Sequence, residues 1–67
     1  MIRITVNDQE EELPAGTTVA QLLERLRMRA RFVAVERNAS LVPRAQHEAC
    51  VLEAGDRLEI VTLVGGG

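Results

Sequence analysis

The 67-residue sequence predicts an α+β domain in which a mixed β-sheet is covered on one face by a single main helix. Apolar and polar residues alternate in segments near both ends of the chain, and this period is typical of half-buried strands. Apolar residues recur at helical spacing in only one segment, which starts at Thr18. A chain of this length has room for one domain, so these segments must share one core.

The N-terminal segment predicts a hairpin. In MIRITVN, apolar residues alternate with polar ones from Ile2 to Val6, as in a strand with one buried face. The next segment, NDQEEEL, opens with the turn formers Asn7 and Asp8 and ends in an apolar residue just before Pro14. We therefore expect a short second strand that pairs antiparallel with the first.

The helix is predicted to begin at a capping box. Thr18 and Gln21 have the spacing at which each side chain binds the other residue's free backbone N–H. The segment TTVAQLLERLRM then places four apolar residues on one face: Val19, Leu22, Leu23 and Leu26. Four arginines alternate at and beyond the helix end, at positions 25, 27, 29 and 31. They cannot share one helical face, so a solvated helix end is favoured over a basic patch.

The segment FVAVERN predicts a third strand, with Val33 and Val35 facing the core and Ala34 facing away. Asn38 and Ala39 then predict a turn into a short fourth strand. That strand, LVP, ends at its proline.

The rest of the chain predicts a connection and the longest strand. RAQHEACVLEAGD reads as a loop or short helix that Val51 and Leu52 anchor to the core. Gly55 and Asp56 form a turn into RLEIVTLV, residues 57–64.

This order of elements is that of a β-grasp, or ubiquitin-like, fold. A right-handed crossover through the helix places the first strand beside either the third or the fifth strand at the centre of the sheet. One helix covers only one face, so the last strand must expose its other side. With Leu58 and Ile60 in the core, Val61 and Leu63 face outward, and with Ala34 they predict a small apolar patch. The alternatives are a strand buried on both faces or scattered apolar surface residues.

Composition narrows the functional classes. The net charge of −2 argues against nucleic acid as a partner, although the chain has eight arginines and lacks lysine. Cys50 is the single cysteine and is expected to be a half-buried apolar residue without a catalytic role. His47 is expected to be a polar loop residue and not part of a metal site. With neither a signal peptide nor a segment that could cross a bilayer, the sequence predicts a cytoplasmic protein that does not bind membranes.

The sequence ends in three glycines, which add nothing to a core. We expect residues 1–64 to form the domain and residues 65–67 a flexible tail. Three extended residues reach about 10 Å, enough to carry a terminal carboxylate into another protein's active site. Glycines could also pass through a tunnel too narrow for side chains. The alternative is a loose terminus without a function.

Three segments carry a resemblance to a known family. ITVNDQEEELPAGTTVAQLLERL, VAVERNASLVPRAQH and AGDRLEIVTLVGGG are similar to the sulfur carrier proteins of thiamine biosynthesis, the ThiS family, and they span nearly the whole chain. The resemblance implies that a ThiF-like adenylyltransferase uses ATP to adenylylate Gly67. A sulfurtransferase or cysteine desulfurase then supplies sulfur for a thiocarboxylate, which a ThiG-like thiazole synthase consumes.

The resemblance also implies roles for the other residues. The chain would be a co-substrate and not an enzyme, with no bound cofactor and no metal. Gly65 and Gly66 would be threaded into the partner, and Ala34, Val61 and Leu63 would form the partner-binding surface.

The alternatives are a sulfur carrier for molybdopterin or another metabolite, and a ubiquitin-like modifier or interaction module. The lack of lysine favours a carrier, because an activated Gly67 could not acylate a side-chain amine of its own chain.

Overall fold

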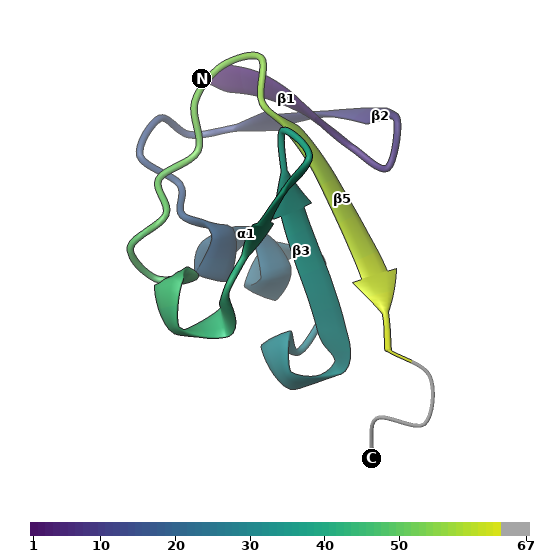
Figure 1. The fold of residues 1–67 in the computed structure, drawn as a ribbon. Helices are drawn as coiled ribbons and strands as arrows, with labels where there is room; N and C mark the ends of the chain where they lie inside the picture. The colour runs from purple at the N-terminus through teal and green to yellow at the C-terminus, as the bar shows by residue number, and fades with distance from the viewer. Residues whose placement is uncertain (64–67) are drawn as a thin grey trace.

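A computed structural model describes residues 1–63, and it confirms the predicted α+β class, with a helix on one face of a five-stranded mixed sheet (Figure 1). The sheet order is β2-β1-β5-β3-β4. The elements are β1 (Ile2–Val6), β2 (Gln9–Leu13), α1 (Val19–Arg25), the 3-10 helix η1 (Ala30–Phe32), β3 (Val33–Arg37), β4 (Ser40–Val42), the 3-10 helix η2 (Arg44–Gln46) and β5 (Arg57–Thr62).

The first and last strands are neighbours at the centre of the sheet. β1 pairs parallel with β5, and the other three strand pairs are antiparallel. Of the two arrangements that the sequence left open, the structure therefore has β1 beside β5. β5 lies between β1 and β3, so the last strand of the domain is also its most central one.

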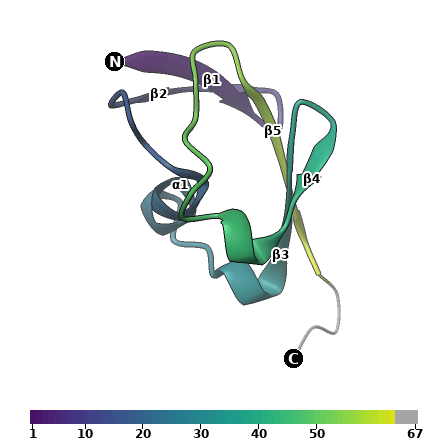
Figure 2. The same ribbon diagram turned by 60° about the vertical axis from the view of Figure 1, so that its left-hand side comes forward.

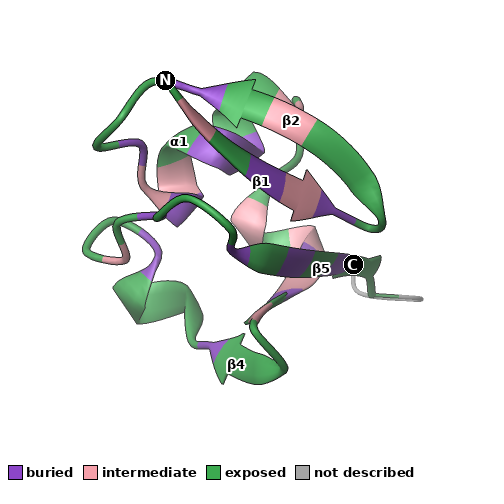
Figure 3. Ribbon diagram, turned by 90° about the horizontal axis from the view of Figure 1, so that it is seen from above, coloured by how far each residue is buried: buried purple, intermediate pink, exposed green. Residues whose placement is uncertain are grey.

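The core lies between the sheet and α1, which covers one face only (Figure 2). Buried and exposed residues alternate along β5, as the colour bands in Figure 3 show. The core side chains that are most completely buried come from both layers: Ile4, Leu13, Val19, Leu22, Val35 and Leu58. The predicted core faces of the helix and of the third and last strands are confirmed.

The ends of α1 are set by local hydrogen bonds. At the N-terminus, the Gln21 N–H donates to Thr18 Oγ1 at 3.2 Å and the Thr18 N–H donates to Gln21 Oε1 at 3.0 Å, which confirms the capping box. At the C-terminus, Arg27 adopts a φ of 60° and the Met28 N–H donates to the Leu23 carbonyl at 2.8 Å. This is a Schellman motif, and it ends the helix at Arg25. Leu26, the last residue of the predicted apolar face, is therefore the C-cap and lies outside the helix.

One expectation for the connection before β5 was wrong, and one left out a buried side chain. Val51 is 48% exposed and only Leu52 is buried, because this stretch is extended beside Thr18 and neighbouring side chains point to opposite sides. His47 lies in the turn after η2, as expected of a loop residue, but it is only 4% exposed. Its ring Nε2 lies 3.1 Å from the Val42 carbonyl oxygen, and its backbone carbonyl accepts the Ala20 N–H. His47 therefore joins β4 to the start of α1.

Replacing Ala39 with glycine is expected to stabilise the fold. Asn38 and Ala39 form the β3–β4 turn with φ values of 50° and 70°. Alanine in this left-handed conformation carries a steric cost that glycine lacks, and the greater entropy of glycine in the unfolded chain offsets part of it. We expect Ala39→Gly to raise the free energy of unfolding by about 0.5–1 kcal/mol, measured by urea unfolding.

The matched control is Ala54→Gly, at an exposed turn position whose φ is not positive. This variant should unfold at the same or a lower urea concentration than the wild type, because glycine gains no steric relief there. An equal shift in both variants would contradict the turn argument.

Candidate functional site

The site begins where β5 leaves the sheet. β5 ends at Thr62, and the Leu63 N–H still donates to the Phe32 carbonyl at 2.8 Å, next to the start of β3. The three predicted tail residues, Gly65, Gly66 and Gly67, lie outside the described residues 1–63, as does Val64. The described part of the site is therefore the strand that leads to the tail and the sheet face beside it.

A side chain holds β5 at its middle. β1 pairs with β5 only at Thr5 and Val6, and the chain then turns away at Asn7. The Asn7 side chain takes the place of the next strand residue: its Oδ1 accepts the Ile60 N–H at 2.9 Å and its Nδ2 donates to the Ile60 carbonyl at 3.1 Å. From the sequence, Asn7 was identified only as a turn former.

A buried carboxylate holds the start of β5. Asp56 accepts hydrogen bonds from Arg37 Nε at 2.9 Å, the Glu53 N–H at 2.9 Å and Asn38 Nδ2 at 3.1 Å. Burial raises the pKa of Asp56, but the hydrogen bonds from Glu53, Asn38 and Arg37 outweigh it and hold the pKa below its ordinary value. The carboxylate therefore stays charged and fixes the turn that feeds β5. The sequence marked Asp56 only as a turn residue.

The sheet face opposite α1 carries exposed apolar residues. Ala34 on β3 lies directly opposite Val61 on β5. Val61 and Leu63 are 57% and 45% exposed, whereas Ala34 is half-buried. The structure also places exposed Leu41 of β4 on this face, opposite Glu36. Leu41 was missed because its strand is too short for a clear period. We call Ala34, Leu41, Val61 and Leu63 the open-face patch.

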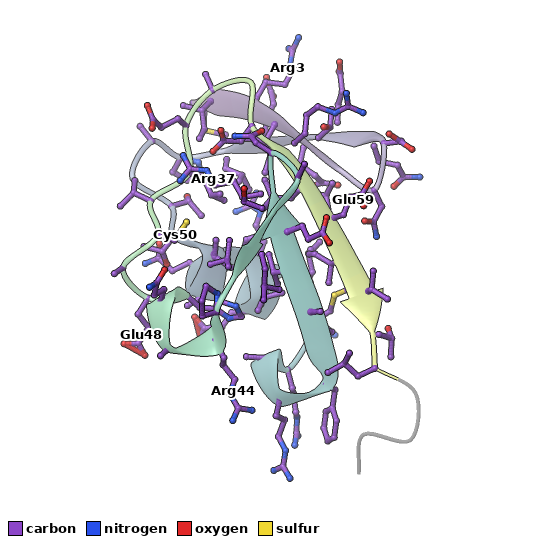
Figure 4. All side chains as sticks on the ribbon, in the orientation of Figure 1. Arg3, Arg37, Arg44, Glu48, Cys50 and Glu59 are labelled. Atoms are coloured by element: carbon purple, nitrogen blue, oxygen red, sulfur yellow. The ribbon has the colours of Figure 1, made fainter. Side chains whose placement is uncertain are left out.

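The remaining candidates lie elsewhere. Cys50 is half-buried against the core, and its sulfur accepts a hydrogen bond from Arg37 Nη1 at 3.5 Å (Figure 4). The four arginines from 25 to 31 are all exposed around the helix end. Within residues 1–63, no three His, Cys, Asp or Glu side chains are grouped so that they could hold a metal ion.

In the same described range, none of the helices has the length and apolar character needed to cross a bilayer.

The comparisons with known proteins agree on one family. Residues 1–67 match the model of the ThiS family. The sulfur carrier protein ThiS of Escherichia coli is 35% identical over 66 residues, which cover 98% of this chain and all of that protein. Thiazole synthases of Paramagnetospirillum magneticum and Magnetococcus marinus are each 39% identical over 66 residues, and the chain spans only 20% of their length.

A solved structure supports the same assignment. The crystal structure of the thiamine biosynthesis protein ThiS from Geobacter metallireducens superposes with a TM-score of 0.85 at 29% identity. The superposition covers 98% of this chain and 100% of that one. The β-grasp arrangement predicted from the order of elements is confirmed.

Proposed function

This chain belongs to the ThiS family, and from that premise we propose that it is the sulfur carrier for formation of the thiamine thiazole. The observation that carries the proposal is the similarity to the E. coli sulfur carrier, which extends over the full length of that protein. In this role the chain is a co-substrate of partner enzymes, and its own residues catalyse no step.

The chemistry takes place at the carboxylate of Gly67. A ThiF-like adenylyltransferase joins this carboxylate to the AMP part of ATP and releases pyrophosphate, which turns a poor electrophile into an acyl-adenylate. The outer sulfur of a persulfide, held by a sulfurtransferase or cysteine desulfurase, attacks the carbonyl carbon and displaces AMP. A thiol then reduces the resulting disulfide bond, and the terminal thiocarboxylate remains.

Thiazole synthase is the proposed acceptor. A stretch similar to this chain forms a fifth of two proteins named thiazole synthase. The presence of a carrier-like segment in a polypeptide named as a synthase supports a role of both in one reaction. This favours the thiazole over molybdopterin or another sulfur acceptor.

The described residues support delivery of the tail in two ways. Asn7 and Asp56 fix β5, so the point from which the tail departs has a defined position on the domain. Three residues of the open-face patch, Ala34, Val61 and Leu63, border that point and offer an apolar surface on which a partner can dock. Gly65 and Gly66 would then thread Gly67 into the partner's active site.

The test is the intact mass of the chain after incubation with ATP, its cognate adenylyltransferase and a persulfide donor. We expect a mass gain equal to the exchange of one oxygen for sulfur, located at Gly67 by fragmentation. The control omits ATP and should show no gain. Pyrophosphate exchange in the presence of this chain shows whether the adenylyltransferase is active. If it is active and the persulfide donor still adds no sulfur at Gly67, the carrier proposal is wrong.

A further inference from the structure

Two glutamates on the open sheet face lie directly opposite each other. In the register of β3 and β5, Glu36 pairs with Glu59, and both side chains are exposed. Like charges in this position repel and lower the stability of the sheet. Among residues 1–63, neither glutamate forms an ion pair. The fold therefore keeps a repulsive pair without a neutralising partner of its own.

A hollow of about 380 Å³ lies beside this pair. Its lining includes Glu36, Glu59 and Asp8, with Arg57 as the one basic residue. Arg57 Nη2 lies 3.7 Å from Asp8 Oδ1, so its charge is shared with a third carboxylate. The hollow thus has an excess of negative charge, and its volume is large enough for a side chain. We call it the acidic hollow.

The acidic hollow adjoins the open-face patch. Leu41 lies opposite Glu36 across β3 and β4, and Val61 is two residues beyond Glu59 on the same face of β5. A partner that covers these apolar side chains would also remove water from the glutamates. Charged groups in such an interface are favourable only when they meet an opposite charge, so the partner surface must present a cation at this point.

We infer that the acidic hollow receives an arginine or lysine side chain of thiazole synthase when the synthase docks on the open sheet face. The inference rests on the proposed function for the identity of the partner. A cation between the two carboxylates turns their mutual repulsion into two attractions. The pair is therefore costly in the free carrier and favourable in the complex.

The experiment measures the dissociation constant between the full chain and its cognate thiazole synthase, at low and high salt, by calorimetry. The variants are Glu36→Gln and Glu59→Gln, which keep the shape of the side chain and remove the charge. We expect each to raise Kd about tenfold at low salt and to reduce the salt dependence of binding. Their melting temperatures should match or exceed that of the wild type, because the repulsion is gone.

The matched control is Glu48→Gln. Glu48 is an exposed glutamate on the other side of the molecule from Glu59 (Figure 4), and its variant should bind like the wild type. If the wild type binds and the two hollow variants bind equally well, the inference is wrong and the proposed function stands. Weaker binding together with a lower melting temperature would indicate a structural role and also overturn it. If the wild type does not bind thiazole synthase at all, the proposed acceptor fails and the inference with it.

Discussion

A chain that ends at Gly66 is expected to lose thiazole formation by at least about 100-fold, because removing one residue draws the reactive carboxylate back by roughly 3.5 Å. An active site that closes around a threaded tail cannot follow a displacement of this size. The last described backbone bond of β5 is made by Leu63, so the deletion removes no contact of the described domain. The melting temperature should therefore stay the same.

The measurement is the rate of thiazole formation with purified partner enzymes and excess carrier. A chain with one added glycine is a second variant, since it shifts the carboxylate outward by a similar distance and keeps every other residue. Both variants should lose thiazole formation if the position of the terminal carboxylate decides the rate. Full activity from the chain that ends at Gly66 would show that the reaction does not require the carboxylate of Gly67.

Asp56→Asn is expected to lower the free energy of unfolding at neutral pH by about 2–4 kcal/mol. The asparagine cannot carry the charge that pairs with Arg37, and its amide group places a donor where the carboxylate accepts. Arg37 remains partly exposed, so water compensates part of the loss.

The pH dependence gives a second check. The pKa of Asp56 is lower in the folded state, so its charged form contributes stability that is fully present above the unfolded pKa of about 3.9. This contribution is lost as the pH falls through the folded pKa. Urea unfolding should therefore show a difference between wild type and variant that is constant near neutral pH and shrinks below about pH 4.

The matched control for this prediction is Asp8→Asn. Asp8 is an exposed carboxylate whose ion pair with Arg57 is long, at 3.7 Å. Its replacement should change the free energy of unfolding by less than about 0.5 kcal/mol. A similar loss of unfolding free energy in both variants would mean that the buried hydrogen bonds of Asp56 stabilise the fold no more than an exposed ion pair does.

The features that the sequence predicted correctly depend on near neighbours in the chain. The capping box of Thr18 and Gln21 spans three residues, and alternation in FVAVERN assigns Val33 and Val35 to the core without any knowledge of the partner strand. Periodicity cannot say which strand lies beside β1, and that question needed the three-dimensional arrangement.

The features that were missed depend on distant residues. Asn7 and Ile60 are 53 positions apart, and nothing near Asn7 marks its side chain as part of the sheet. His47 is a polar residue in a loop, and only the approach of β4 and α1 buries it. Glu36 and Glu59 meet because of the β3–β5 register, which the sequence does not display. The tail itself is the part of the site that the sequence reveals most directly.

The central position of β5 has a mechanical consequence. When a partner draws the tail into its active site, as the proposed function requires, a pull directed along the axis of β5 acts on the whole strand. The hydrogen bonds to β1, β3 and Asn7 lie across that axis, so the load is shared among them instead of opening one bond at a time. β5 is thus loaded in shear, the direction in which a sheet resists force best. The domain is therefore expected to stay folded while a partner holds its C-terminal residues.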